Sequence, residues 1–144
     1  MHRDTVQYLF VYGSLRSGFS SSAYNYISKY FSLIGLAKTK GLLYDMGEFP
    51  VAVSTEDDLF ILGELYKINN VEAFDFVFAQ IDDYEGITVE ENLTPMYFKT
   101  TTAVLFEGQT IEAWVYWFNG NVDGKLVIKS GDIFDYLKHK KKNI

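Results

Sequence analysis

The sequence predicts an α+β fold in which a mixed β-sheet, open or curled into a barrel, is flanked by two or three helices. Short β-branched and aromatic runs between turn residues predict several strands, and two segments with apolar residues at three-and-four spacing predict helices. Hydrophobic residues make up 48% of the 144 residues, enough for a buried core, and we expect one domain over residues 1–144.

The strands are predicted from apolar runs that end at glycine, proline or polar residues. Gln7 to Tyr12 is such a run and stops at Gly13, as is typical of a buried strand that leads into a turn. Ala113 to Phe118 is continuously apolar, which indicates a strand covered on both faces or closed into a barrel. In full, the predicted strands are residues 7–12, 31–37, 41–44, 58–68, 96–106 and 111–118, with Pro50 in a loop and a turn over residues 107–110.

Helix signals occur in three places. A first helix begins at the serines of residues 20–22 and has a buried face of Ala23, Tyr26, Ile27 and Tyr30. A second begins at Asn69 or Asn70, and its apolar stripe is Phe74, Val77, Phe78 and Ile81. A third is predicted from about Ser130.

Composition excludes several classes of function. The net charge of -6 argues against a nucleic-acid partner, which would need a basic surface. Cysteine is absent, and His2 and His139 lie close to the chain ends, so thiol and histidine catalysis and a histidine-rich metal site are not expected. With no run of eighteen apolar residues and no leader-like start, we expect a cytoplasmic protein without a membrane partner.

Glu85 occupies an unusual position for an acid. It takes the next place on the apolar stripe after Ile81, whereas Asp82 and Asp83 fall on other faces of the helix. Burial of Glu85 without a cationic partner would raise its pKa toward the range of a useful general base. The alternative is that the helix ends near Asp83 with Gly86 as its stop, which would leave Glu85 in solvent.

The turn after the first strand is the second candidate element. Its sequence is Tyr12-Gly13-Ser14-Leu15-Arg16, and amides released from a sheet at such a point can donate to a carbonyl or anionic oxygen. An ordinary strand-end turn, with Tyr12 in the core and Ser14 as a local cap, is the alternative.

The two elements together resemble the γ-glutamylcyclotransferase-like (AIG2-like) family. Its members carry Tyr-Gly-Ser/Thr-Leu-Arg after the first strand and later Leu-Asp-x-Tyr-Glu-Gly, which correspond here to residues 12–16 and to Ile81-Asp82-Asp83-Tyr84-Glu85-Gly86. Segments 41–50, 62–66, 113–116 and 128–132 are also similar to family segments in the same order. The resemblance therefore spans nearly the whole chain.

The resemblance implies a small mixed β-barrel flanked by helices and a catalytic role for Glu85. It implies that Tyr12, Gly13, Ser14, Leu15 and Arg16 bind a small γ-glutamyl substrate, and Tyr97 at the start of the hairpin is a further binding candidate. The implied reaction releases 5-oxoproline by attack of the substrate's own α-amine and requires no cofactor and no metal.

Three questions stay open at the level of sequence. Glu64, within the apolar flank of residues 62–66, is a reserve candidate for the base, although an outward-facing strand position is the simpler expectation. The chain could instead be a non-catalytic module that binds or senses a small ligand, or an interaction protein. The γ-glutamyl substrate and the oligomeric state are not determined by the sequence.

Overall fold

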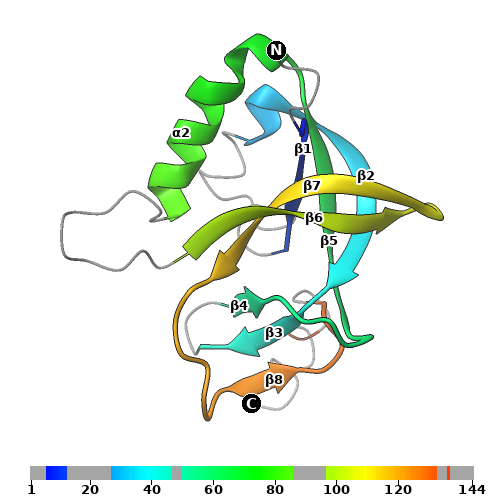
Figure 1. Cartoon of the computed structure of the whole chain (residues 1–144), viewed down its shortest axis with the longest axis vertical. Coiled ribbons are helices and arrows are strands. Elements are labelled where there is room, and N and C mark those ends of the chain that lie inside the picture. Colours follow the sequence, from blue (N-terminus) through cyan, green and yellow to red (C-terminus); the bar gives the residue numbers. More distant parts are fainter. Residues whose placement is uncertain (1–5, 13–26, 47–49, 86–96, 133–135, 137–144) are drawn as a thin grey trace.

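The structure, a computed structural model, describes residues 6–12, 27–46, 50–85, 97–132 and 136, and side chains within these ranges except those of residues 82–85. Figure 1 shows a strand barrel with a long helix along one side and a small sheet below it. The elements are β1 (Tyr8–Val11), β2 (Phe31–Lys40), β3 (Leu42–Asp45), β4 (Pro50–Val53), β5 (Phe60–Ile68), the 3₁₀ helix η2 (Val71–Ala73), α2 (Phe74–Glu85), β6 (Tyr97–Phe106), β7 (Gln109–Phe118) and β8 (Leu126–Ile128).

Five strands form the closed barrel, in the order β1-β5-β2-β6-β7. The neighbours pair antiparallel, except that β1 and β7 run parallel where Leu9 meets Trp114 and the barrel closes. Closure removes the exposed strand edges of an open sheet. The predicted fold class, an α+β fold with a small mixed barrel, is therefore confirmed.

The second half of β7, Ala113 to Phe118, is apolar at every position, and the structure shows why. Ala113, Val115 and Trp117 belong to the cluster inside the barrel, whereas Tyr116 belongs to a second cluster that includes α2, and Trp114 packs against that cluster. Alternate side chains of a strand point to opposite faces, so both faces of β7 are covered. The prediction from the continuous apolar run is thus confirmed.

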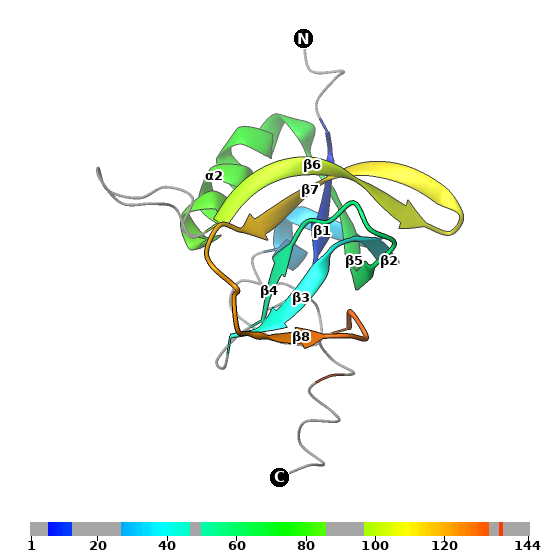
Figure 2. The ribbon, with the colours of Figure 1, turned by 60° about the horizontal axis from the view of Figure 1, so that its bottom comes forward.

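The small sheet has the order β4-β3-β8, and two of its strands were not predicted. Figure 2 shows it across the lower end of the barrel. The loop prediction at Pro50 was wrong, because β4 lies at the edge of the sheet and Pro50 is its first residue, where proline costs no ladder hydrogen bond. Strand β8 has only three residues, too few for a periodicity signal.

Helix α2 follows the predicted pattern. Asn70 is the N-cap of η2, where its side chain accepts a hydrogen bond from the Glu72 amide at 3.0 Å. Val77, Phe78 and Ile81 are then buried in the cluster shared with β1 and β7. The helix continues to Glu85, so the alternative in which it ends near Asp83 is wrong.

The remaining predicted elements are described in part. The hairpin of β6 and β7 turns on Glu107 and Gly108, with φ of 48° and 77°, so its loop is tighter than the predicted four residues. Residues 27–30 are helical and Ile27 is buried, but the start of that helix lies outside the described residues. Near the predicted third helix, the Tyr136 amide donates to the Asp132 carbonyl at 3.0 Å. In the part of the chain described, no helix has the length and apolar character needed to span a bilayer.

Candidate active site

The end of β1 is anchored from inside the barrel. Tyr12 is buried with the barrel cluster, and its hydroxyl donates to the carbonyl of Tyr116 on β7 at 2.6 Å. This bond joins Tyr12, the first residue of the predicted binding turn, to the strand that closes the barrel. Tyr12 is thus a core residue in the structure, and Gly13, Ser14, Leu15 and Arg16 lie outside the described residues.

We expect Tyr12→Phe to lower the free energy of unfolding by about 1–2 kcal/mol, because the buried carbonyl of Tyr116 loses a hydrogen bond while the ring still fills its site. Denaturant unfolding of the variant and the wild type measures this. Tyr8→Phe on the same strand is the control, and an equal loss there would mean that the 2.6 Å bond contributes nothing specific.

Helix α2 carries Glu85 to the level of the same strand end. Strand β1 runs antiparallel to β5, and α2 turns back along β5, so β1 and α2 run in the same direction (Figure 1). The ring of Phe78 lies 6.2 Å from that of Trp114, which is the register partner of Leu9. Phe78 and Leu9 therefore lie at about the same height. From there, α2 advances by roughly 10 Å over the seven residues to Glu85, and the chain of β1 advances by roughly 10 Å over the three residues to Tyr12.

The backbone of Glu85 therefore reaches about the height at which β1 ends. Its place on the helix continues the side of α2 that faces the barrel, since Ile81, one turn earlier, is buried there. The side chain of Glu85 itself lies outside the described part of the structure.

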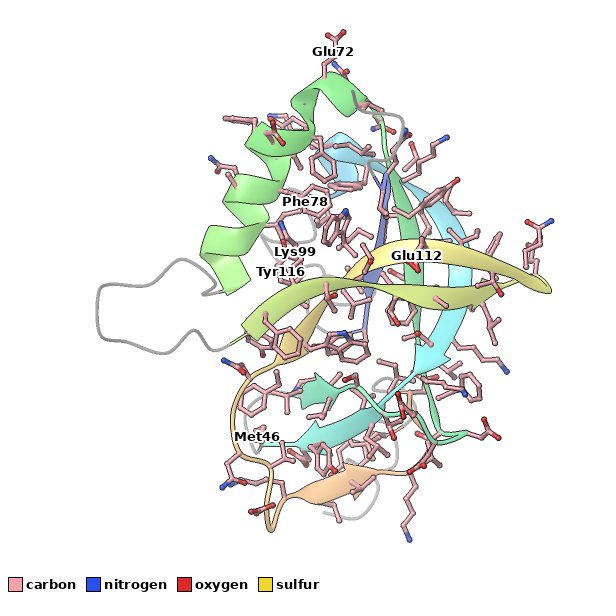
Figure 3. All side chains as sticks on the ribbon, viewed as in Figure 1. Met46, Glu72, Phe78, Lys99, Glu112 and Tyr116 are labelled. Atoms are coloured by element: carbon pink, nitrogen blue, oxygen red, sulfur yellow. The ribbon has the colours of Figure 1, made fainter. Side chains whose placement is uncertain are left out.

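Two polar residues lie between α2 and the hairpin. Lys99 on β6 and Tyr116 on β7 are cross-strand partners, and Figure 3 shows both beside the C-terminal half of α2. The Lys99 ammonium lies 5.0 Å from the ring centroid of Phe78 and 5.2 Å from that of Trp114. Tyr97 lies two residues before Lys99, on the same face of β6, with its ring 5.8 Å from that of Phe118.

Glu64 is a second acid near the end of β1. It is the register partner of Val11, and its carboxylate oxygen Oε1 accepts a hydrogen bond from the buried Tyr66 hydroxyl at 3.0 Å. The outward-facing position expected for Glu64 does not leave it in solvent, because its side chain is only 5% exposed. It does point away from the barrel interior, but that outer face is covered, as the burial of Tyr66 and Val11 on the same side shows.

The arrangement offers acid–base chemistry. Glu64 on β5 lies beside the end of β1, the backbone of α2 continues to residue 85, and a lysine lies between α2 and the hairpin. The described residues contain no group of three or more histidine, aspartate or glutamate side chains placed to hold a metal ion.

Among the described residues, two cavities lie away from these side chains. One of about 260 Å³ is lined by β2, β5 and β6, with Leu36, Leu62 and Leu105 among its walls. The other, of about 330 Å³, lies around β3 and β8. Both are lined mainly by aliphatic side chains and glycines, and neither includes Tyr12, Glu64 or Lys99.

Comparisons with known proteins agree with this architecture. The family described as "Gamma-glutamyl cyclotransferase, AIG2-like" matches residues 9–135. MJ1514 of Methanocaldococcus jannaschii, provisionally named a gamma-glutamylcyclotransferase, is 32% identical over 134 residues, which cover 91% of this chain and 98% of MJ1514.

Solved structures give the same result for the fold. YkqA from Bacillus subtilis is similar with a TM-score of 0.68 and 25% identity over 94% of this chain, which spans 42% of YkqA. An AIG2-like protein from Mus musculus is similar with a TM-score of 0.62 and 20% identity, over 81% of this chain and 80% of the mouse protein. The chain therefore belongs to the gamma-glutamylcyclotransferase, AIG2-like family.

Proposed function

We propose that this protein is a γ-glutamylcyclotransferase that releases 5-oxoproline from a γ-glutamyl amine or γ-glutamyl amino acid, with Glu85 as the general base. The observation that supports the proposal is that the backbone of α2 continues to Glu85, one turn beyond Ile81, which is buried against the barrel. Membership of the family supports the same reaction class.

The reaction joins two atoms of one substrate molecule. The α-amine of a γ-glutamyl compound is mostly protonated at neutral pH and cannot attack in that form, so a carboxylate must first take a proton from it. The free amine then attacks the γ-carbonyl carbon and forms a five-membered ring with a tetrahedral centre. The acid gives its proton to the leaving nitrogen as the bond from this carbon to that nitrogen breaks and the carbonyl re-forms. The ring nitrogen still carries one extra proton, which the regenerated carboxylate removes and which the released amine takes up as it becomes an ammonium.

The other binding residues are assigned by their place in the chain. The amides of Gly13, Ser14 and Leu15 would steady the oxygen of the tetrahedral centre, where negative charge develops. Arg16 and Tyr97 would contact the bound substrate. A substrate held in its folded form gains the rate advantage of an intramolecular reaction, so this chemistry needs no external nucleophile.

The test is an assay of 5-oxoproline release from γ-glutamyl amino acids, γ-glutamyl amines and γ-glutamyl-lysine isopeptides. We expect release from at least one of these classes. If γ-glutamyl compounds bind and no product forms, the protein is a binding module and the proposal is wrong. The panel also identifies the preferred leaving group.

Glu64→Gln tests the reserve assignment of the base. Glutamine keeps an oxygen that can accept the Tyr66 hydrogen bond, but it cannot take a proton. Because we assign the base to Glu85, we expect kcat of Glu64→Gln to stay within about tenfold of wild type in the same assay. A loss of kcat of several hundredfold in Glu64→Gln would transfer the role of base to Glu64.

A further inference from the structure

One wall of the barrel, formed by β2, β5 and β6, is apolar on its outer side. Lys38 on β2 is the register partner of Leu62 on β5 and of Leu105 on β6, so these three side chains form a row across three strands. Leu36 lies two residues before Lys38, on the same face of β2. All four line the cavity of about 260 Å³. Because its wall residue Leu36 is 71% exposed, this cavity is an open groove on the surface.

The groove continues into a larger aliphatic surface. Leu33 and Ile34, earlier on β2, are exposed as well. By contrast, α2 packs in one cluster with buried residues of β1 and β7 and so covers the outer side of these strands. In the part of the chain that the structure describes, no element covers the aliphatic side chains of β2 in this way. Exposed apolar patches of this kind mark sites of contact with another protein.

Residues of opposite charge lie on either side of Leu62. Lys38 is one strand away on β2, and its ammonium lies over the ring of Phe60 at 4.9 Å while the side chain stays exposed. On the other side of Leu62, beyond the end of β1, the Leu62 amide donates to the carbonyl of Gly131 at 2.7 Å. Asp132 follows directly and lines the same groove. A basic and an acidic residue therefore flank Leu62, each about one strand spacing away.

We propose that this groove is the interface of a homodimer, in which two copies of the chain pack face to face about a two-fold axis near Leu62. A two-fold contact requires a patch that is complementary to itself. Half a turn of the row formed by Asp132, Leu62 and Lys38 places Leu62 against Leu62 and each Lys38 opposite Asp132 of the other copy. The leucines supply the buried area, and the two ion pairs fix the relative orientation. The inference does not depend on the proposed function.

A second copy fits this groove better than a small ligand or a partner of a single charge. The walls are mainly exposed leucines and offer a ligand few polar groups to fix its orientation. A strongly acidic partner would place its charge against Asp132, and a strongly basic one against Lys38. The groove is also remote from the proposed reaction site, because α2 lies on the other side of the barrel from β2 (Figure 1). Both sites of the dimer therefore stay open.

Sedimentation velocity of the full chain across the micromolar range measures the association. We expect wild type to form dimers and Leu62→Glu to raise the dimer Kd by roughly 100-fold or more, because two carboxylates then face each other at the axis. Leu126→Glu is the matched control, since Leu126 is 61% exposed on β8 of the small sheet, and it should leave the Kd unchanged. A wild type that stays monomeric, or a dimer that Leu62→Glu does not weaken, would overturn the inference.

Charge reversal tests the two-fold arrangement itself. Lys38→Glu and Asp132→Lys should each raise the dimer Kd by roughly 10-fold or more, because either variant alone places like charges at both contacts. An equal mixture of the two variants should dimerise again, since every contact of the mixed dimer joins opposite charges. Mixing does not repair a folding defect, so this rescue is specific to the interface. Single variants that dimerise like wild type, or a mixture that stays as weak as its components, would reject the two-fold packing.

Discussion

Replacement of Glu85 by glutamine should lower kcat for 5-oxoproline release by about 10²- to 10⁴-fold, the usual contribution of a positioned general base. Glutamine has nearly the shape of glutamate and helix propensity close to it, so α2 should still form up to residue 85. The measurement compares kcat and KM with the free energy of unfolding of the same preparations. A large loss of kcat with unchanged stability is the expected result.

Asp83→Asn is the control for this experiment. Asp83 is on the same turn of α2 and loses the same charge, but it is rotated by about 200° from Glu85 around the helix axis. It should keep nearly full activity. Equal activity of wild type and Glu85→Gln would reject Glu85 as the base, and the result for Glu64→Gln would then decide whether the other acid near β1 takes that role.

Gly63→Ala should be the most disruptive single-methyl change in the barrel wall. A Cβ atom at Gly63 would lie 2.3 Å from the carbonyl oxygen of Val11 and 2.6 Å from the ring of Phe10. The backbone oxygen cannot rotate away, so β5 must move from the end of β1. We expect a loss of about 1–3 kcal/mol in the free energy of unfolding, as is typical of overpacking, measured by denaturant unfolding.

The same displacement should affect activity, because the end of β1 leads into the proposed binding turn. We therefore expect kcat/KM of Gly63→Ala to fall even at temperatures where the variant is fully folded. Gly41→Ala is the matched control, since its Cβ would meet side-chain atoms of Trp117 and Ile61 at 3.1–3.3 Å, which can adjust. A Gly63→Ala protein as stable and active as wild type would show that β1 and β5 tolerate separation at this point.

Much of the fold could be predicted because the signals are local. Apolar runs gave most of the barrel strands, and three-and-four spacing gave the buried face of α2. The small sheet was harder, since β8 is short and β4 begins at a proline, which is usually a loop signal. Its strands are defined by pairing with β3, which no local pattern reveals.

The residues of the candidate site could likewise be predicted only where a local pattern indicates them. The position of Glu85 follows from one step along the stripe after Ile81, so the sequence indicated it. The burial of Glu64 depends on what covers the outer face of β5, and the alternation of β5 gave no sign of it. The setting of Lys99 depends on Phe78 and Trp114, from two elements on either side of it in the chain, so only the tertiary structure reveals it.

The closure of the barrel also has a consequence for how the chain acquires its structure. Strand β1 lies between β5 and β7, and its partner residue Trp114 is synthesised about a hundred residues after Leu9. During synthesis on the ribosome, β1 cannot pair with β7 until most of the polypeptide has been made. Such long-range pairing slows folding, and we expect the seam between β1 and β7 to form late and to be the first part of the barrel to open under stress.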